Sequence, residues 1–399
     1  MRILLCHNRY VMRTGEDMAF DSLRILLERA GHQLLFYTRD NQSISSFDFS
    51  DKFLLPGRAL YSSKNRKDIS AFVNREKPAV AIVQNVFPLL SPSIYYGLAE
   101  SNIPVIQLVF NYRMLCANGQ LYTNGKICER CVGGNYLHGF LRRCYRESYM
   151  LSGVYSASLA VHRMADTWRK CVRFFVVPDK FLGNKLVEGN LPADRMRTIA
   201  NPFDIDSCRA APQPGDYALF VGLLSRQKGI FTLLDAIMRC DGIRLIIVGD
   251  GPERENVRCH PAVVAGHAEL KGRVYGEKLN ELMAGCAFVV VPSEWYDNLP
   301  MVVCQAFATA KPVIASRING IPEYVGHEHN GLLFPPGDSQ ELARAMQRLF
   351  LDASLQALLG GRARQTAEEL FHPKRWMRQM DGVLEEAIRT QPDLVRGER

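Results

Sequence analysis

The polar residues of the stretch 291–322 have types and spacing that suit the binding of a charged ligand. They follow a short apolar run, 286–291, which is the pattern of a strand buried on both faces of a sheet. Pro300 stands where helices accept a proline in their first turn, so a helix is expected directly after it. Asp297 and Asn298 would then lie at the carboxyl end of a parallel strand, beside a helix N-terminus that favours an anionic group.

Gln305 adds a second polar group to this stretch. It is eight residues beyond Asp297, roughly one and a half helical turns past Pro300. Two polar groups at that separation would contact opposite ends of one long, phosphate-bearing ligand.

A second loop has the composition of a pyrophosphate-binding turn. The apolar run Tyr217–Val221 predicts a strand, Gly222 follows it, and Lys228 precedes a predicted helix. Glycine lets the backbone approach a phosphate closely, the helix end is positive, and a lysine adds a point charge. Gly251 stands in a similar turn after the next strand, where a plain tight turn explains the glycine equally well.

The rest of the chain supplies the elements that must position these loops. Buried-strand patterns alternate with helical patterns through both halves, which predicts two doubly wound α/β domains with parallel sheets. A polar, proline-bearing segment near 199–216 predicts the linker between them. Strands are expected at 2–5, 33–37, 78–84, 104–109, 172–177, 217–221, 245–248, 286–291 and 312–316, and helices at 18–30, from 93, before 189, and at 230–239, 278–284, 302–310, 340–350 and 374–388.

Composition and charge exclude several classes of protein. With 47% hydrophobic and 23% charged residues the chain of 399 residues is an ordinary globular one, and no apolar run approaches the roughly 20 residues that span a membrane. Residues 1–6 are apolar without a small-residue cleavage site, so they predict a strand and not an export signal. The net charge of +8 forms no clustered stripe, so a nucleic-acid partner is not expected.

Part of the positive charge gathers in the first half of the chain. Two interpretations stay open: a solvated surface, or a patch that suits an anionic membrane or a polyanionic acceptor. The residues are Arg142, Arg143, Arg146, Arg163, Arg169, Lys170 and Arg173.

Taken together, the motifs resemble those of the retaining glycosyltransferases of the GT-B fold, family 4 (glycosyl transferases group 1). The family's Glu-x7-Glu motif stands here as Asp297-x7-Gln305, within the sequence WYDNLP, which is similar to the family's WYEN-P variant. Residues 222–229 resemble its G-R-L-x3-K-G loop, and 249–252 its G-x-G-P turn. The resemblance spans nearly the whole chain and is strongest from 222 to 337.

The resemblance implies a fold and its domains. Two Rossmann-like domains are expected to face each other across a cleft, and a C-terminal helix is expected to return to the first domain. Residues 1–195 would form the acceptor-side domain, 196–372 the domain that binds the nucleotide sugar, and 373–399 the returning helix.

The resemblance also implies roles for individual residues at the donor site. Asp297 and Lys228 would be the catalytic residues, because a lysine stabilises the charge of a leaving diphosphate and a carboxylate holds the transferred sugar. The residues expected to bind the donor are Gly222, Arg226, Lys228, Gly251, Asn298, Leu299 and Gln305. No metal cofactor is expected for catalysis.

A smaller set of residues is expected on the acceptor side. Gly15 and Glu16 lie in the first glycine-bearing turn, and Asn111 and Arg113 follow a predicted strand, where they alternatively form a turn-stabilising pair.

The activity expected from the resemblance is transfer of a hexose-like sugar from a UDP- or GDP-sugar to a glycan or lipid-linked acceptor, with retention. Surface polysaccharide biosynthesis is the expected setting, in the cytoplasm and peripherally on the inner face of the membrane. Four positions depart from the family signature: Leu223, Asp297, Gln305 and Phe110. A non-catalytic GT-B protein that binds or scaffolds is therefore the alternative, and an epimerase or hydrolase on the same fold is a third.

Four of the eleven cysteines fall close together in the sequence. A Cys-x2-Cys pair flanked by two further cysteines would complete a tetrahedral thiolate site for a structural zinc ion, although four reduced structural thiols explain the pattern equally well. They are Cys116, Cys128, Cys131 and Cys144.

Overall fold

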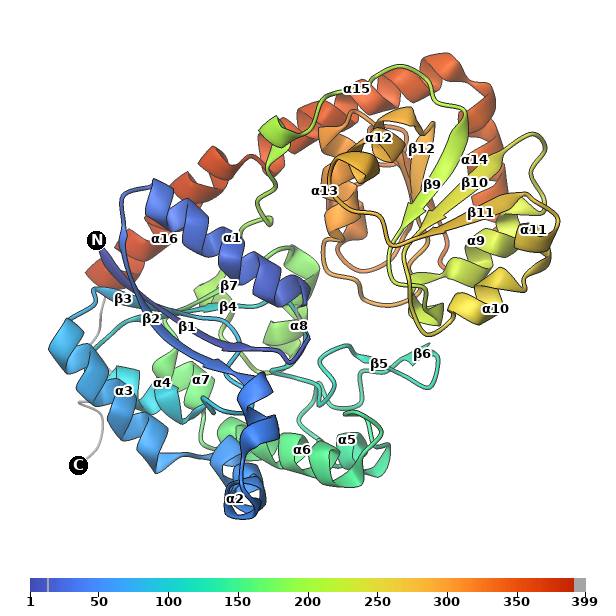
Figure 1. Ribbon diagram of the computed structural model, residues 1–399. Coiled ribbons are helices and arrows are strands. Elements are labelled where there is room, and N and C mark those ends of the chain that lie inside the picture. Colours follow the sequence, from blue (N-terminus) through green and yellow to red (C-terminus); the bar gives the residue numbers. More distant parts are fainter. Residues whose placement is uncertain (13, 391–399) are drawn as a thin grey trace. The chain divides into compact units, whose positions relative to one another are not determined.

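A computed structural model describes residues 1–12 and 14–390 of the chain (Figure 1). The chain divides into two compact units, each with its own parallel sheet. Of the described residues, unit 1 contains 1–12, 14–123, 128–199 and 377–390, whereas unit 2 contains Asn124–Ile127 and Ala200–Trp376.

Unit 1 is built on a six-stranded parallel sheet in the order β2-β1-β3-β4-β7-β8. Its inner strands are buried on both faces and apolar except for Gln107, as expected where helices cover both sides of a parallel sheet. The strands are β1 (Arg2–Arg9), β2 (Gln33–Asp40), β3 (Val80–Val83), β4 (Val105–Leu108), β7 (Phe174–Val177) and β8 (Met196–Thr198), and a separate hairpin pairs β5 (Tyr122–Thr123) with β6 (Lys126–Ile127).

The helices of unit 1 connect these strands. The last of them, α16 (Pro373–Arg389), runs on from unit 2 and is held to unit 1 by an Arg197–Glu386 ion pair of 2.7 Å and a His32–Asp381 contact of 3.1 Å. The others are α1 (Gly15–Arg29), α2 (Phe49–Leu60), α3 (Ser63–Glu76), α4 (Ser93–Glu100), α5 (Leu137–Leu141), α6 (Tyr149–Met164), α7 (Thr167–Cys171) and α8 (Lys180–Glu188).

Unit 2 has a second six-stranded parallel sheet, in the order β11-β10-β9-β12-β13-β14. The strands are β9 (Tyr217–Val221), β10 (Arg244–Val248), β11 (Ala268–Gly272), β12 (Phe288–Val291), β13 (Val313–Ser316) and β14 (Gly331–Phe334). The helices are α9 (Ile230–Ile237), α10 (Arg254–Arg258), α11 (Pro261–Val264), α12 (Glu277–Gly285), α13 (Met301–Ala308), α14 (Ser339–Leu351) and α15 (Ala353–Leu370).

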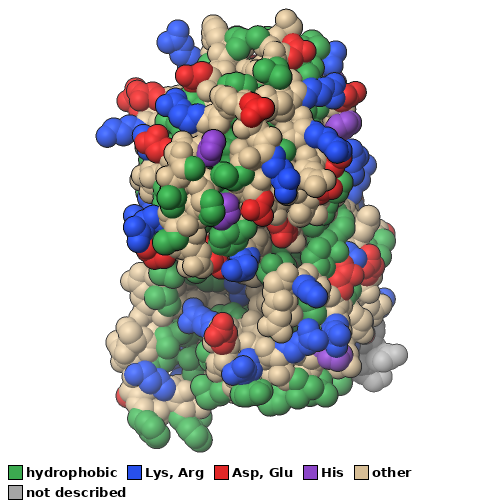
Figure 2. All heavy atoms as spheres, turned by 90° about the vertical axis from the view of Figure 1, so that its right-hand side faces the viewer, with side chains coloured by type: hydrophobic (Ala, Val, Ile, Leu, Met, Phe, Trp, Pro, Cys, Tyr) green, Lys and Arg blue, Asp and Glu red, His purple; other side chains and the backbone are tan. Residues whose placement is uncertain are grey.

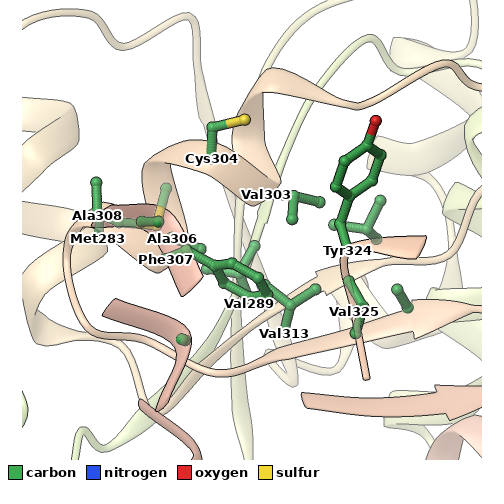
Figure 3. Packing of buried hydrophobic residues seen from close by; sticks show 14 of the residues in the cluster. Met283, Val289, Val303, Cys304, Ala306, Phe307, Ala308, Val313, Tyr324 and Val325 are labelled. Carbon is green, nitrogen blue, oxygen red and sulfur yellow. The ribbon is translucent and has the colours of Figure 1, made fainter. Parts of the chain in front are cut away.

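The core of unit 2 fixes the helix that follows the predicted ligand loop. On α13, Val303 and Phe307 are fully buried, and they pack with Val289 of β12 and Val313 of β13 in one hydrophobic cluster (Figure 3). Because this face of α13 is apolar and almost wholly removed from water, the start of the helix is held firmly against the ends of the strands.

The expected fold is confirmed: the chain has two Rossmann-like units with parallel sheets, the GT-B fold. Most element bounds differ from the prediction by a few residues. Among the expected elements, the largest difference in bounds is at β1, which continues to Arg9 because the polar residues His7 and Asn8 are buried and hydrogen-bonded, His7 to Asp17 at 3.0 Å. Several elements were not expected, among them α6, α15, β11 and β14. The expected linker also contains a buried anchor, Ile205, in a short 3₁₀ turn.

Within the described residues, no helix combines the length and the apolar character that a membrane crossing needs.

Candidate functional site

Glycines join the loops that follow β9 and β10 in unit 2. The loop after β9 lies so close to the loop after β10 that a Cβ on Gly249 would stand 1.8 Å from the Gly222 carbonyl oxygen. A Cβ on Gly251 would stand 2.4 Å from the Leu224 carbonyl oxygen, and the Leu224 amide donates to the Asp250 carbonyl at 3.0 Å. The two loops therefore pack backbone against backbone, which only glycine permits at these positions.

A third contact joins the loop after β9 to the loop after β12. Gly229 has a φ of +69°, and a Cβ on it would stand 1.8 Å from the Pro292 carbonyl oxygen. The Glu294 amide donates to the Gln227 carbonyl at 2.9 Å across the same junction. Residue 228 is thereby placed beside residue 297, although the two are far apart in sequence.

Lys228 and Asp297 form an ion pair at this junction. The Lys228 Nζ donates to Asp297 Oδ2 at 2.5 Å, and the Ser293 hydroxyl donates to the same oxygen at 2.9 Å. The side-chain amide of Asn319 donates to the Asp297 carbonyl at 2.7 Å, and the Lys228 ammonium lies 5.6 Å from the centre of the Trp295 ring. Since Asp297 is only 7% exposed, the carboxylate is held in a single position from several sides.

The place of this pair in the sheet is one where α/β proteins bind ligands. The loops that carry it follow β9 and β12, which are neighbours in the sheet, and β9 pairs with β10 on its other edge. The direction of strand order reverses at this point, and ligands bind outside the carboxyl ends of strands at such reversals.

Besides the side-chain oxygen of Asn319, two buried hydrogen-bond donors near the pair have no partner within residues 1–12 and 14–390. They are the indole Nε1 of Trp295 and the hydroxyl of Ser225, and both are removed from water. Buried donors are normally satisfied, so these two atoms indicate that a ligand with acceptor oxygens would complete the site.

The remaining residues of the expected donor set differ in their surroundings. Arg226 pairs with Glu253 at 3.1 Å and lies over the Phe231 ring, so its charge is already balanced. Gln305 donates to Asn280 Oδ1 on α12 at 3.0 Å. The structure therefore brings Lys228 and Asp297 together but leaves Arg226 and Gln305 on other partners.

Two residues of the WYDNLP loop precede α13. Asn298 is partly buried, whereas Leu299 is buried in the core with a φ of +27°. Pro300 is the N-cap residue of α13, so it precedes the first turn of the helix and was wrongly expected within it.

Sequence reasoning missed four residues around the pair: Ser293, Asn319, Trp295 and Ser225. Ser293 and Trp295 stand in the same loop as Asp297, and Asn319 stands in an Asn-Gly turn, a weak signal for a special loop conformation. Their side-chain directions follow from the packing of the loops, which spacing alone does not specify.

In unit 1, three of the four expected acceptor-side residues line one pocket together with aromatic residues. Arg113 lies over the Tyr10 ring and 3.9 Å from Glu16, whose carboxylate also accepts a hydrogen bond from the Tyr10 hydroxyl. Burial and the Glu16 charge raise the pKa of Tyr10 well above its usual value. The Asn111 side chain accepts from the Arg113 amide at 2.9 Å, so this pair does stabilise a turn.

Gly15 does not line that pocket as described. It is the first residue of α1, and a Cβ there would meet no atom within 4 Å, so packing does not require a glycine. Phe110, one of the four positions that depart from the family signature, lines the same pocket as Arg113.

The four cysteines of the predicted zinc site line one small cavity together with His138. Burial, with the neighbouring cysteines, raises the pKa of the Cys131 thiol to about 12, and the Cys116 thiol donates to Asn118 Oδ1 at 3.0 Å. In the described parts of the chain, however, no three His, Cys, Asp or Glu side chains are arranged so as to hold a metal ion. Four thiols are the kind of ligands that bind zinc, but their side chains are not close enough together here to hold one ion. The zinc site therefore stays a prediction.

Comparison with known proteins adds to this geometry. Residues 215–352 match the family model of glycosyl transferases group 1. An uncharacterized glycosyltransferase of Methanocaldococcus jannaschii is 33% identical over 40% of this chain and 46% of its own length. The lipopolysaccharide core biosynthesis glycosyltransferase LpsE of Rhizobium meliloti is 27% identical over 39% of this chain and 45% of its own length. The chain thus spans about half the length of the curated relatives it matches.

Among solved structures, HepE of Anabaena in complex with UDP superposes with a TM-score of 0.68 at 16% identity, covering 97% of this chain and 100% of that one. This structural match, at low sequence identity, shows the fold. The chain therefore has the GT-B fold, and its segment 215–352, which carries the Lys228–Asp297 pair, matches the glycosyl transferases of group 1.

Proposed function

We propose that this protein is a retaining glycosyltransferase that moves a sugar from a nucleotide-diphospho-sugar to a glycan or lipid-linked acceptor. The observation that carries the proposal is the Lys228–Asp297 pair at the reversal of strand order, inside the segment that matches glycosyl transferases of group 1. The solved structure of HepE with UDP supports a nucleotide donor.

Lys228 has the role of stabilising the leaving group. The bond between the anomeric carbon and the diphosphate oxygen breaks, and the diphosphate leaves with the electron pair and an added negative charge. A lysine ammonium that already lies in place stabilises that charge as it develops, without reorganisation of the site, and no metal is needed in the step. The Trp295 indole N–H and the Ser225 hydroxyl donate additional hydrogen bonds to oxygens of the nucleotide sugar.

Asp297 has the role of holding the transferred sugar. Its carboxylate accepts from sugar hydroxyls and stabilises the positive charge that develops at the anomeric carbon. The acceptor hydroxyl then attacks on the face that the diphosphate leaves, and its proton passes to the departing diphosphate. Aspartate is shorter than glutamate by about 1.5 Å, and the Ser293 hydroxyl fixes the shorter side chain.

Gln305 has the role of contacting the ribose of the donor, and Arg226 that of a second positive charge once Glu253 is displaced. The pocket of Glu16 and Arg113 in unit 1 receives the acceptor. Surface polysaccharide biosynthesis at the cytoplasmic face of a membrane is the proposed setting, supported by the Rhizobium meliloti relative.

Thermal unfolding with a panel of UDP- and GDP-sugars tests the proposal. A ligand at a hundred times its Kd stabilises the folded state by about 2.7 kcal/mol, which shifts the Tm of a unit of this size by several degrees. We expect one donor to raise the Tm of the wild type and to raise that of Lys228→Met far less. The absence of a shift with every donor would overturn the proposal.

A second measurement separates transfer from the other activities. The stabilising donor is incubated with the protein and a cell-membrane extract, and the products are analysed with and without the extract. Transfer requires the extract, whereas release of sugar or an altered donor without it would identify a hydrolase or an epimerase. Saturable binding with no product in either case would identify a non-catalytic binder.

A further inference from the structure

The helix α6 of unit 1 presents apolar side chains to solvent. Its inward face carries Tyr155, Leu159, three serines and His162, all buried, whereas Met150 is 66% exposed and Met164 79% exposed. Val161 is exposed between them. The outward face of a surface helix is normally polar, so these exposed apolar side chains indicate that something apolar covers the outward face of α6.

Two neighbouring helices extend this apolar surface. α2 lies along α6, held by a hydrogen bond of 2.8 Å between the His162 Nε2 and the Leu60 carbonyl, and it exposes Phe49 at 87% and Phe53 at 76%. α5 packs on α6 through the Phe140 and Tyr149 rings, 5.7 Å apart. We call this surface the α2–α5–α6 face, and its exposed apolar residues are Phe49, Phe53, Leu54, Leu137, Leu141, Tyr149, Met150, Val161 and Met164.

The figures show where this face lies. Figure 1 places α2, α5 and α6 along the lower margin of unit 1. Figure 2 shows hydrophobic side chains gathered along that lower margin, with Lys and Arg side chains next to them.

Positive charge accompanies the apolar residues. Within the described chain, no carboxylate forms an ion pair with Arg142, Arg143 or Arg146, whose segment joins α5 to α6. Arg143 lies over the Tyr149 ring at 5.4 Å, which keeps its cation beside the apolar surface. Apart from Arg163 of α6, the charged residues of these segments are Lys52, Arg58, Arg142, Arg143 and Arg146 on the positive side and Asp48, Asp51 and Glu147 on the negative side, and Arg58 pairs with Asp51.

Two other members of the basic cluster noted in the sequence, Arg163 and Arg173, have partners within the fold. Arg163 donates to the Val132 and Gly189 carbonyls, and Arg173 stacks on Phe174 and donates to the Thr390 hydroxyl. Arg163 and Arg173 therefore serve the fold, whereas Arg142, Arg143 and Arg146 have no ion-pair partner among the described residues and lie near exposed apolar side chains.

We propose that the α2–α5–α6 face docks on the surface of an anionic phospholipid bilayer. The aromatic and methionine side chains enter the boundary between headgroups and acyl chains, the helices lie in the plane of the membrane, and the arginines contact lipid phosphates. The charge of the face selects this partner, because free arginines around an apolar centre complement an anionic interface. The inference does not depend on the transferase activity and has its own readout.

Flotation with lipid vesicles tests the proposal. The full chain is mixed with phosphatidylcholine vesicles that contain or lack phosphatidylglycerol, at low and at high salt. We expect binding to the anionic vesicles only, and less of it at high salt. Arg143→Ser and Arg146→Ser should each weaken binding about fivefold, because a basic residue near such a surface contributes about 1 kcal/mol.

The apolar part of the face has a matched control. Phe53→Ser with Met164→Ser removes two exposed side chains of the face, and we expect at least a tenfold loss of vesicle binding. Val264→Ser with Tyr275→Ser removes two side chains of unit 2 that are 74% and 73% exposed, and it should bind vesicles as the wild type does. A cooperative thermal unfolding transition near that of the wild type, measured without ligand, shows that each variant is folded.

Three results would overturn the proposal. The first is that the wild type fails to float with anionic vesicles at every salt concentration, and the second is that both double variants lose binding equally. The third is that the wild type is a dimer which the Phe53→Ser with Met164→Ser variant converts to a monomer, because a second copy of the chain would then cover the face.

Discussion

Replacing Lys228 by methionine tests how strongly the Asp297 carboxylate depends on its partner. Methionine keeps most of the apolar stem near Trp295 and removes the ammonium 2.5 Å from the carboxylate. Asp297 retains the Ser293 hydroxyl at 2.9 Å but loses its counter-charge while only 7% exposed. Leaving such a group without its charged partner costs about 1–3 kcal/mol.

The expected size of the effect follows from the size of the unit. The Tm of a unit of 150–250 residues falls by about 2–4 °C for each kcal/mol of lost stability. The Tm of unit 2 should therefore fall by about 2–12 °C. The double variant Lys228→Met with Asp297→Asn has no unpaired charge, and it should recover at least half of that loss.

Differential scanning calorimetry of the ligand-free protein provides the measurement. Lys271→Met serves as the control in the same unit, since it breaks the exposed Lys271–Glu269 pair on β11 and should change the stability by less than about 1 kcal/mol. If the double variant melts no higher than Lys228→Met, the carboxylate does not need the lysine and the reasoning is wrong.

Gly229→Ala should destabilise unit 2 by more than about 2 kcal/mol and abolish stabilisation by donor, because its Cβ would stand 1.8 Å from the Pro292 carbonyl; calorimetry with and without UDP-sugars checks this. Gln305→Glu should tighten UDP binding about fivefold by calorimetric titration, since a charge-assisted hydrogen bond is roughly twice as strong as a neutral one. Elemental analysis should find about one zinc per chain, and none after Cys128→Ser with Cys131→Ser.

Each of these predictions has a control or a contrary outcome. Gly242→Ala has a similar φ of +72° with no atom within 4 Å of the Cβ, so it should cost only about 1–2 kcal/mol of backbone strain. Gln347→Glu, on α14, should leave UDP affinity as it is. A wild type free of metal would end the zinc hypothesis, and Cys259→Ser should not change the metal content.

The sequence predicted the fold well because buried parallel strands are continuous apolar runs. β12 and β13 were expected within two residues of their observed starts, and α13 within two residues at either end. The polar end of β1 was missed because His7 and Asn8 are buried only through partners distant in sequence, such as Asp17 and Asn85. No local pattern encodes such pairs.

The candidate site was predictable in its residues but not in its pairings. Glycine and lysine spacing pointed to residues 222–229, and the resemblance pointed to Asp297. The ion pair between Lys228 and Asp297 depends on the backbone contact at Gly229, which only the folded loops reveal. For the same reason, the partners of Arg226 and Gln305 were not foreseen.

The glycine contacts of unit 2 divide its donor loops into positions that tolerate variation and positions that do not. A combinatorial library aimed at new donor sugars would lose most of its members by randomising Gly229, Gly249 or Gly251, because each of these touches a carbonyl oxygen of another loop. Leu223, which is exposed, and Arg226, whose side chain lies on the surface, are free of that constraint. Such a library should therefore randomise those two positions and leave the three glycines unchanged.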